Sequence, residues 1–573
     1  MIGTLLPIAV RRRPSILTPV DSLLPTRAQF NIIRNLTKTE PVEHPSAESQ
    51  VYLVGGGIAA LSAAFYLIQD AGMDGANIHV LENLKVPGGS MDAHGTAEKG
   101  YLMRGGRMFD REAYTCLYDI LANIPSLRTP GKSCKEDIFE FSAQFKTCSK
   151  ARVVAEGAKI MDVHTLGLNI KDRAAFTELI LLPEAMIDGR KINDYFTEEF
   201  FTSNFWYCFC TTFAFQPWHS LLEFRRYALR FMHEVPQLDT LAGVWRTPYN
   251  QYDSIIHPLQ KWLSEKGVQF EYDTIVTSVD FEILENQRYI YAIHGTRKGV
   301  RFDTEIKRTD LCLVTLGSMT AGSSIGSMST PPKIDNEAAK NDPCWVLWRD
   351  IAKRQPDFGR PEVFYDHIND SKFLSFSVTF HDSTFMDRLV EWTKNEPGTG
   401  ALVTFKDSNW FMSTVFPHQP HFANQPKNVN VMWGYSLFPD RVGNFVKKPM
   451  TECSGEEILI ELLNHYQFTD ILEPVLKSAN CIPSMLPYTM SQFNQRRITD
   501  RPKVIPQNAI NFGFMSQFVE SIPEDTVFTV EYSVRCAQIA VYGLLKLDKP
   551  LTPIYKGWLD PKVLVKSSLA INS

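Results

Sequence analysis

The chain has 573 residues, a net charge of −5 and an isoelectric point near 6.3. This length exceeds one simple core, so we expect at least two structural domains. The negative charge argues against a nucleic-acid-binding protein. The ten cysteines are scattered without a CxxC pair, which predicts neither a metal site nor a disulfide framework. No stretch of about 18 apolar residues predicts a membrane span.

The amino terminus is rich in arginine and poor in acids. Arg11, Arg12 and Arg13 are followed by Arg27 and Arg34, and no acid precedes residue 21. Such a segment is typical of a mitochondrial presequence, but a disordered extension has the same composition. Both interpretations stay open, so we expect the protein in the cytoplasm, or in mitochondria if the segment is a presequence.

A nucleotide-binding motif follows this segment. The apolar strand Val51–Val54 leads into a glycine turn at Gly55 and Gly57, and an apolar helix begins at once, with Ala60 in the third position of a GxGxxA pattern. A second short strand then delivers Glu82, whose carboxylate is placed to accept hydrogen bonds from a ribose. The order of these features predicts a dinucleotide site for FAD or NAD.

Further glycine turns favour FAD over NAD. Gly88, Gly89 and Ser90 follow the second strand, where a close backbone approach suits a longer cofactor. A strand much later in the chain ends in Gly317 and Ser318, whose small side chains also suit contact with a cofactor. We therefore predict FAD as the cofactor.

A third glycine loop carries two arginines, Arg104 and Arg107, on either side of Gly106. Their guanidinium groups are suited to an anion such as a pyrophosphate or a carboxylate. A surface turn with salt bridges is the alternative.

The remaining pattern predicts an α/β fold with a discontinuous Rossmann-like FAD-binding domain, an inserted mixed α+β substrate domain and a helical C-terminal part. The expected parts are an N-terminal extension (1–48), the FAD-binding domain (49–145, 290–330 and 495–545), the substrate-binding region (146–289 and 331–494) and a tail (546–573).

The tail mixes Lys556, Lys562 and Lys566 with apolar residues such as Trp558 and Leu559. This composition is suited to peripheral contact with a membrane surface, and equally to a tail docked on the protein.

Several segments together are far more specific than the glycine motif alone. They are Val54–Leu61, Pro87–Met91, Arg104–Arg107, Asn204–Ser220, Tyr249–Tyr252 and Asn424–Pro426. In these segments, and from about residue 50 to 545, the chain resembles the oleate hydratases, also called the myosin-cross-reactive antigen family of FAD-binding fatty acid hydratases. The resemblance implies FAD, and addition of water to an isolated cis double bond of a long-chain unsaturated fatty acid, typically oleate to 10-hydroxystearate.

The resemblance implies that Tyr227 donates the proton to the alkene. It also implies a glutamate that activates water, but Met108 stands at that position here. Methionine has no acidic proton and cannot act as a general base. Our hypothesis is that Asp110 takes the final proton instead.

The resemblance places Gln251 close to the substrate and His421 near the fatty acid carboxylate. The polar residues that precede this histidine in the family are Val415 and Pro417 here, so the carboxylate has other candidate partners. These candidates are His418, Gln419 and Ser413.

Three other functions remain as alternatives: a flavin-dependent oxidoreductase on the same fold, a fatty acid double-bond isomerase, and a non-catalytic binder of lipid or flavin. The expected small-molecule partner is a long-chain unsaturated fatty acid. Related enzymes are often homodimers, but the loop around Met108 departs from theirs, so monomer and homodimer both stay open.

Overall fold

The computed structural model describes residues 44–573, which form one compact unit. The arginine-rich segment with its predicted targeting role lies outside the described residues. Among residues 44–573, no helix has both the length and the apolarity that crossing a bilayer requires.

The first layer is a parallel sheet of five strands in the order β18-β11-β1-β2-β7. The apolar segment predicted as the first strand, β1, is its centre and pairs with β11 on one side and β2 on the other. The strands are β1 (Val51–Val54), β2 (Ile78–Leu81), β7 (Gln269–Glu271), β11 (Leu311–Thr315) and β18 (Phe512–Met515).

Two helices cover this sheet from opposite ends of the chain. Helix α2 (Ile58–Gln69) starts directly after the glycine turn, and its first ten residues are all buried. It packs against α16 (Val530–Leu544), which follows β18. Because β11, β18 and α16 return to β1 and α2 from distant parts of the sequence, the structure confirms a discontinuous Rossmann-like domain.

The predicted boundary at residue 289 is wrong. It falls inside β9 (Gln287–Arg297), the middle strand of an antiparallel sheet with β8 (Thr274–Leu284) and β10 (Val300–Glu305). In addition, β7 pairs in parallel with β2. Strand β7 is the edge strand of the nucleotide sheet. The chain therefore returns to this sheet before residue 289.

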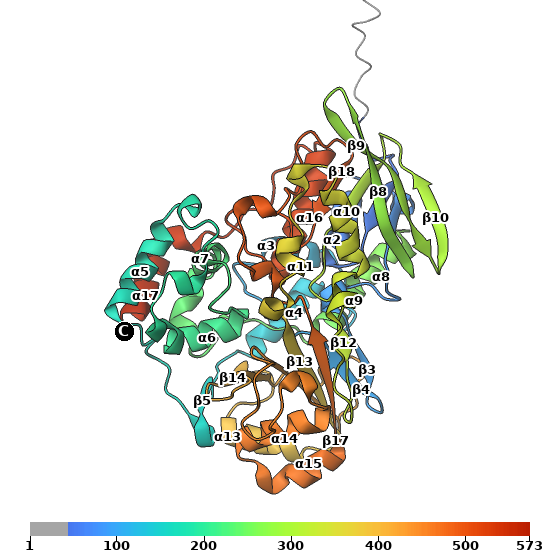
Figure 1. The fold of residues 1–573 in the computed structure, drawn as a ribbon. Coiled ribbons are helices and arrows are strands. Elements are labelled where there is room, and N and C mark those ends of the chain that lie inside the picture. Colours follow the sequence, from blue (N-terminus) through green and yellow to red (C-terminus); the bar gives the residue numbers. More distant parts are fainter. Residues whose placement is uncertain (1–43) are drawn as a thin grey trace, which may run out of the picture. The chain divides into compact units, whose positions relative to one another are not determined.

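The second layer is a mixed sheet of eight strands in the order β12-β17-β13-β16-β15-β14-β5-β6. Helices α13 (Thr384–Thr393), α14 (Gly455–Tyr466) and α15 (Leu472–Ser478) lie together over it (Figure 1). The strands are β5 (Val153–Ala155), β6 (Lys159–Ile160), β12 (Ser324–Ile325), β13 (Phe373–Phe380), β14 (Leu402–Phe405), β15 (Met412–Val415), β16 (Asn430–Ser436) and β17 (Ala479–Leu486).

A helical part completes the described chain. Its elements are α5 (Ile170–Leu181), α6 (Asn204–Phe213), α7 (Leu221–Arg230), the short helix η7 (Met232–Gln237) and α17 (Pro561–Asn572). The apolar residues around Phe205 form α6, and Tyr227 lies in α7, shortly before η7.

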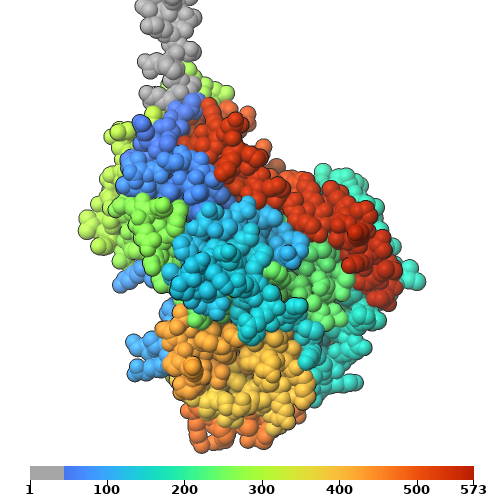
Figure 2. Space-filling view, turned by 180° about the vertical axis from the view of Figure 1, so that it is seen from behind, coloured from blue at the N-terminus to red at the C-terminus, as the bar shows by residue number. Residues whose placement is uncertain are grey.

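The C-terminal tail docks on this helical part. Helix α17 lies beside α5, and the red C-terminal residues end against the teal surface of residues near α5 (Figures 1 and 2). Ser567 donates a hydrogen bond to the carbonyl oxygen of Met232 at 2.7 Å. Leu559, Val565 and Leu569 remain exposed. Docking is thus observed, and membrane contact through these outward side chains stays a prediction.

A buried ion cluster fixes α7. Glu223 accepts a hydrogen bond from Arg496 at 2.8 Å and lies 3.0 Å from a guanidinium nitrogen of Arg501. On the next turn, Arg226 lies 2.7 Å from Glu520. Burial alone would raise the pKa of Glu223, but the guanidinium groups of Arg501 and Arg496 lower it to about 2. The cluster therefore joins α7 to the loops before and after β18.

We predict that Glu223→Gln lowers the free energy of unfolding at pH 7 by about 3 kcal/mol, because it leaves the buried guanidinium of Arg501 without a carboxylate and Arg496 with Glu520 alone. The folded pKa lies below the unfolded value, so this stabilisation is present above about pH 4.5 and is lost as the pH falls toward 2. Urea denaturation measures it. The control Glu473→Gln removes an exposed carboxylate beside Lys477 and should change stability by less than about 0.5 kcal/mol. Equal effects of both changes would contradict a structural role for the cluster.

Candidate active site

A cavity of about 390 Å³ lies at the carboxyl ends of the parallel strands, where Rossmann folds bind nucleotides. We call it the nucleotide cavity. It brings together most of the residues predicted to bind the cofactor. Those that line it are Gly55, Gly57, Glu82, Gly88, Gly89, Ser90, Arg104, Gly317 and Ser318.

The glycine turn has two different constraints. Gly55 has a φ of +97°, and an added Cβ would lie 3.0 Å from Thr315 Oγ1. Gly57 has an ordinary φ of −74°, and an added Cβ would meet no atom within 4 Å. Gly55 is therefore required by the turn, whereas Gly57 keeps the cavity open at the start of α2, where free N–H groups attract phosphate.

Glu82 is held at the wall of the nucleotide cavity. Its two oxygens accept hydrogen bonds from the backbone N–H groups of Gly56 at 2.6 Å and Leu84 at 2.7 Å. Burial raises the pKa of this carboxyl, and the two backbone donors oppose the shift. The fixed carboxylate fits the predicted contact with a ribose.

Three residues predicted to bind the cofactor lie elsewhere. Ala60 is completely buried within α2, so it provides close helix packing and not a cofactor contact. Gly106 and Arg107 line adjoining cavities instead of the nucleotide cavity. Arg104 does line it, but its guanidinium also forms an ion pair with Asp92 at 2.9 Å.

Three smaller cavities meet at Gly106 and Arg107. The Tyr227 cavity is lined by Met108, Asp110 and Tyr227, and the Arg246 cavity by Arg246, Gln251 and His421. A connecting cavity shares Arg107 with both, and shares Ser90 and Arg104 with the nucleotide cavity. A chain of cavities thus runs from the nucleotide cavity to the Tyr227 cavity and to the Arg246 cavity.

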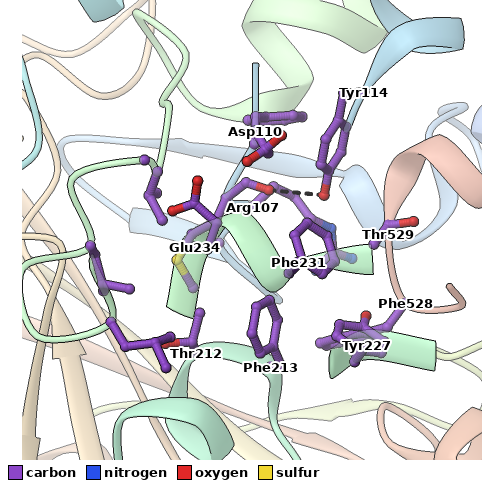
Figure 3. A pocket seen from close by; sticks show the side chains of 17 residues that line it. Arg107, Asp110, Tyr114, Thr212, Phe213, Tyr227, Phe231, Glu234, Phe528 and Thr529 are labelled. Carbon is purple, nitrogen blue, oxygen red and sulfur yellow. Dashed lines mark hydrogen bonds between the residues drawn. The ribbon is translucent and has the colours of Figure 1, made fainter. Parts of the chain in front are cut away.

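The Tyr227 cavity is largely apolar. The fully buried Tyr227 is surrounded by phenylalanine rings, and its hydroxyl donates a hydrogen bond to the carbonyl oxygen of Val527 at 2.6 Å. Burial raises its pKa well above 10. Figure 3 shows Tyr227 and Phe528 on one side of the cavity and Asp110 and Glu234 on the other.

Met108 and Asp110 lie in the same cavity, as predicted for residues that act together. Met108 is half-buried and presents a thioether where a carboxylate was expected from the resemblance. Asp110 is buried, and its Oδ2 lies 2.8 Å from Nε2 of His233.

Sequence reasoning missed His233 and Glu234. Nε2 of His233 lies 3.5 Å from a carboxyl oxygen of Glu234, which lines the Tyr227 cavity. Burial, and then the neighbouring Asp110, raise the pKa of Glu234 to about 9. One signal was available, because Glu234 follows Tyr227 by seven residues and therefore shares its helical face.

The Arg246 cavity holds three of the five residues predicted near the substrate, namely Gln251, His418 and His421, whereas Gln419 and Ser413 do not line it. Gln251 donates a hydrogen bond to the carbonyl oxygen of Gly105 at 2.8 Å. His421 is half-buried near Arg246 and His418, and desolvation lowers its pKa to about 3, so it is neutral. The prediction for Ser413 is corrected by the structure. Ser413 lies inside β15, and its Oγ forms a hydrogen bond with Oγ1 of Thr404 on the neighbouring strand β14 at 2.9 Å. It therefore lines neither the Tyr227 cavity nor the Arg246 cavity.

Arg246 is the second residue that sequence reasoning missed in this region. Its Nη2 is sealed from solvent and has no hydrogen-bond partner, and among residues 44–573 its guanidinium has no ion-pair partner. Burial lowers its pKa to about 10, so it remains charged at neutral pH. Arg246 is half-buried, and a guanidinium whose Nη2 is sealed without a partner is stabilised when a ligand supplies an anion; a carboxylate matches the guanidinium fork.

The parallel sheet and the glycine turn define a Rossmann-type fold, and the chain of cavities adjoins the carboxyl ends of its strands. The chain belongs to the MCRA family, whose model matches residues 48–542. This confirms the resemblance seen in the sequence motifs.

Two relatives are similar over almost their whole length. The chain is 34% identical to an oleate hydratase of Streptococcus pyogenes, over 96% of this chain and 93% of the relative. It is also 34% identical to a linoleate hydratase of Lactiplantibacillus plantarum, over 91% and 98%. The fold is similar to that of cyclohexylamine oxidase from Brevibacterium oxydans, with a TM-score of 0.50, 12% identity and coverage of 87% of this chain and 99% of that chain.

We predict that Arg246→Met raises the free energy of unfolding of the fatty-acid-free protein by about 1–2 kcal/mol, because it removes an unpaired buried charge. Thermal unfolding measures the change. The matched change Arg152→Met should instead lower stability, since Arg152 Nη2 donates to Cys208 O and Thr211 Oγ1 at 2.7 and 2.9 Å. A loss at Arg246 as large as that at Arg152 would assign Arg246 a structural role.

Proposed function

We propose that the protein adds water to an isolated cis double bond of a long-chain unsaturated fatty acid, with FAD in the nucleotide cavity. The unpaired Arg246 carries this proposal, because a buried guanidinium beside an apolar cavity suits a ligand with one carboxylate and a long hydrocarbon chain. The names of the two hydratase relatives support the same reaction.

FAD fits the nucleotide cavity through the open face of Gly57, the fixed carboxylate of Glu82 and the turn at Gly88 and Gly89. Hydration is redox-neutral, so bound FAD shapes and polarises the neighbouring site without being consumed. The connecting cavity, which joins the nucleotide cavity to Arg107, provides the contact between the two sites.

In the proposed reaction, Arg246 holds the carboxylate and the alkene lies in the Tyr227 cavity. The hydroxyl of Tyr227 leaves the carbonyl of Val527 and gives its proton to one alkene carbon. Water attacks the other carbon, and Asp110 on the opposite side accepts the released proton (Figure 3). Met108 only bounds the cavity.

Tyr227 requires a nearby positive charge to act as a proton donor, because burial makes its phenolate unfavourable. The guanidinium of Arg107 opposes that effect on the pKa of Tyr227. Arg107 is held nearby by hydrogen bonds to Ser90, at 3.1 Å to the carbonyl oxygen and 3.0 Å to Oγ. Arg107 therefore stabilises the charge that develops on Tyr227.

We predict that the FAD-loaded protein converts oleate to a product heavier by one labelled water in ¹⁸O-water, as measured by mass spectrometry. Tyr227→Phe should lower the rate by at least about a hundredfold, because it removes the proton donor, while FAD affinity stays unchanged. A wild-type product with a shifted double bond would favour an isomerase, and stoichiometric flavin reduction an oxidoreductase. Bound but unchanged oleate would favour a non-catalytic binder.

We also predict that Gly57→Ala weakens FAD binding at least about tenfold in a fluorescence titration, because the new methyl group enters the phosphate-binding face. Its unfolding free energy should change by less than about 0.5 kcal/mol, since the φ of −74° is ordinary. Gly55→Ala should cost about 1–2 kcal/mol of stability, because its φ is +97°. Absence of FAD binding by the wild type would refute the cofactor proposal.

A further inference from the structure

Two carboxyl groups occupy one wall of the Tyr227 cavity. Asp110 and Glu234 face each other there in Figure 3, across the cavity from Tyr227. Together with His233 they present three ligand or acid–base atoms that all lie within 4.8 Å of one another. Only Asp110 has a role in the reaction proposed above.

The carboxyl group of Glu234 occupies space that is free only because residue 243 is a glycine. A Cβ added to Gly243 would overlap both carboxyl oxygens of Glu234. The carboxyl group is thus packed directly against the backbone of Gly243 and cannot swing toward that side. A glutamine at position 234 has the same shape, which makes Glu234→Gln a change of charge and not of volume.

The cluster also faces a second space. A surface hollow is lined by His233 and Glu234 together with Tyr555, Lys566 and Ser567 of the C-terminal tail. Glu234 lines both this hollow and the inner Tyr227 cavity, so it forms part of the wall between them. Nδ1 of His233 is buried and has no hydrogen-bond partner in the described chain, which leaves it available to a water molecule or a proton.

Two buried carboxyl groups at this separation cannot both carry a full negative charge, so they share one proton. Glu234 holds it, because burial and the charge of Asp110 raise the pKa of Glu234 to about 9. Oδ2 of Asp110 lies 2.8 Å from Nε2 of His233. The other titratable groups around the cluster are Arg107, Arg111, Glu112, Tyr114, Tyr555 and Lys566.

We propose that Asp110 and Glu234 form a proton-sharing carboxyl pair that takes the place of the carboxylate absent at Met108, and that His233 connects this pair to the surface hollow. Glu234 and His233 are the new members of the site. The inference rests on the proposed hydration, and it specifies where the proton of the added water goes.

The protons balance over one turnover. The O–H bond of Tyr227 breaks and a C–H bond forms on the alkene; the water oxygen forms the C–O bond and loses one proton to Asp110. The pair, now carrying two protons, releases one through His233 to water in the hollow. Tyr227 regains one proton from solvent. The sum is alkene plus water giving alcohol, with the protein restored.

The test compares Glu234→Gln, Glu234→Asp and the control Glu112→Gln, a neighbouring acid on the same hollow. The readouts are ¹⁸O incorporation into oleate by the FAD-loaded protein and FAD affinity. We expect the kcat of Glu234→Gln to fall at least about a hundredfold with KM within about threefold, and Glu234→Asp to recover part of the loss. Glu112→Gln should stay within about twofold of wild type.

Infrared spectroscopy supplies a readout that does not depend on turnover. At pH 7 the wild type should show the carbonyl band of a buried protonated carboxyl group, and Glu234→Gln should lack it. Absence of the band in the wild type would overturn the inference, as would a hydrating wild type with an equally active Glu234→Gln. Loss of wild-type activity on chelation would also overturn it, in favour of a cation held by the same three residues. A wild type that shows the band without hydrating oleate would refute the proposed function instead.

Discussion

The buried ion cluster around Glu223 is the constraint on which the candidate site depends. It fixes α7 against the loops before and after β18, and Tyr227 follows Arg226, a member of that cluster, directly in the sequence. Since η7 continues from α7, the same anchor also places Glu234. Charge pairs that are buried this completely contribute position more than net stability. The helix that carries Tyr227 is therefore held in place by one set of electrostatic contacts.

The parts of the candidate site differ in charge and polarity. Arg246 provides a lone positive charge, the rings around Tyr227 provide an apolar middle, and Asp110 with Glu234 provides an acidic wall. Gly106 and Arg107 stand where these cavities meet, next to the space that fits FAD. Such separation suits a substrate whose charged head and reacting double bond lie far apart along one chain.

The nucleotide domain could be predicted well because local rules determine it. The strand at Val51–Val54 and the helix after Gly57 follow from apolar runs that are separated by a glycine turn. The boundary at 289 failed because the place of β7 depends on a tertiary pairing. Arg246 was missed because its significance lies in a guanidinium nitrogen without a partner, and His233 and Glu234 were missed because their closeness to Asp110 is a tertiary contact. Ser413 was misassigned for the same reason, because its exposure to a cavity is a tertiary property.

The most direct test of the account is a crystal structure of the Tyr227→Phe variant with FAD and oleate bound. The account requires the carboxylate at the Arg246 guanidinium and the double bond between the ring at position 227 and the Asp110–Glu234 pair. A fatty acid bound in the reverse direction, with its carboxylate against Asp110, or with its double bond outside the Tyr227 cavity, would contradict the account.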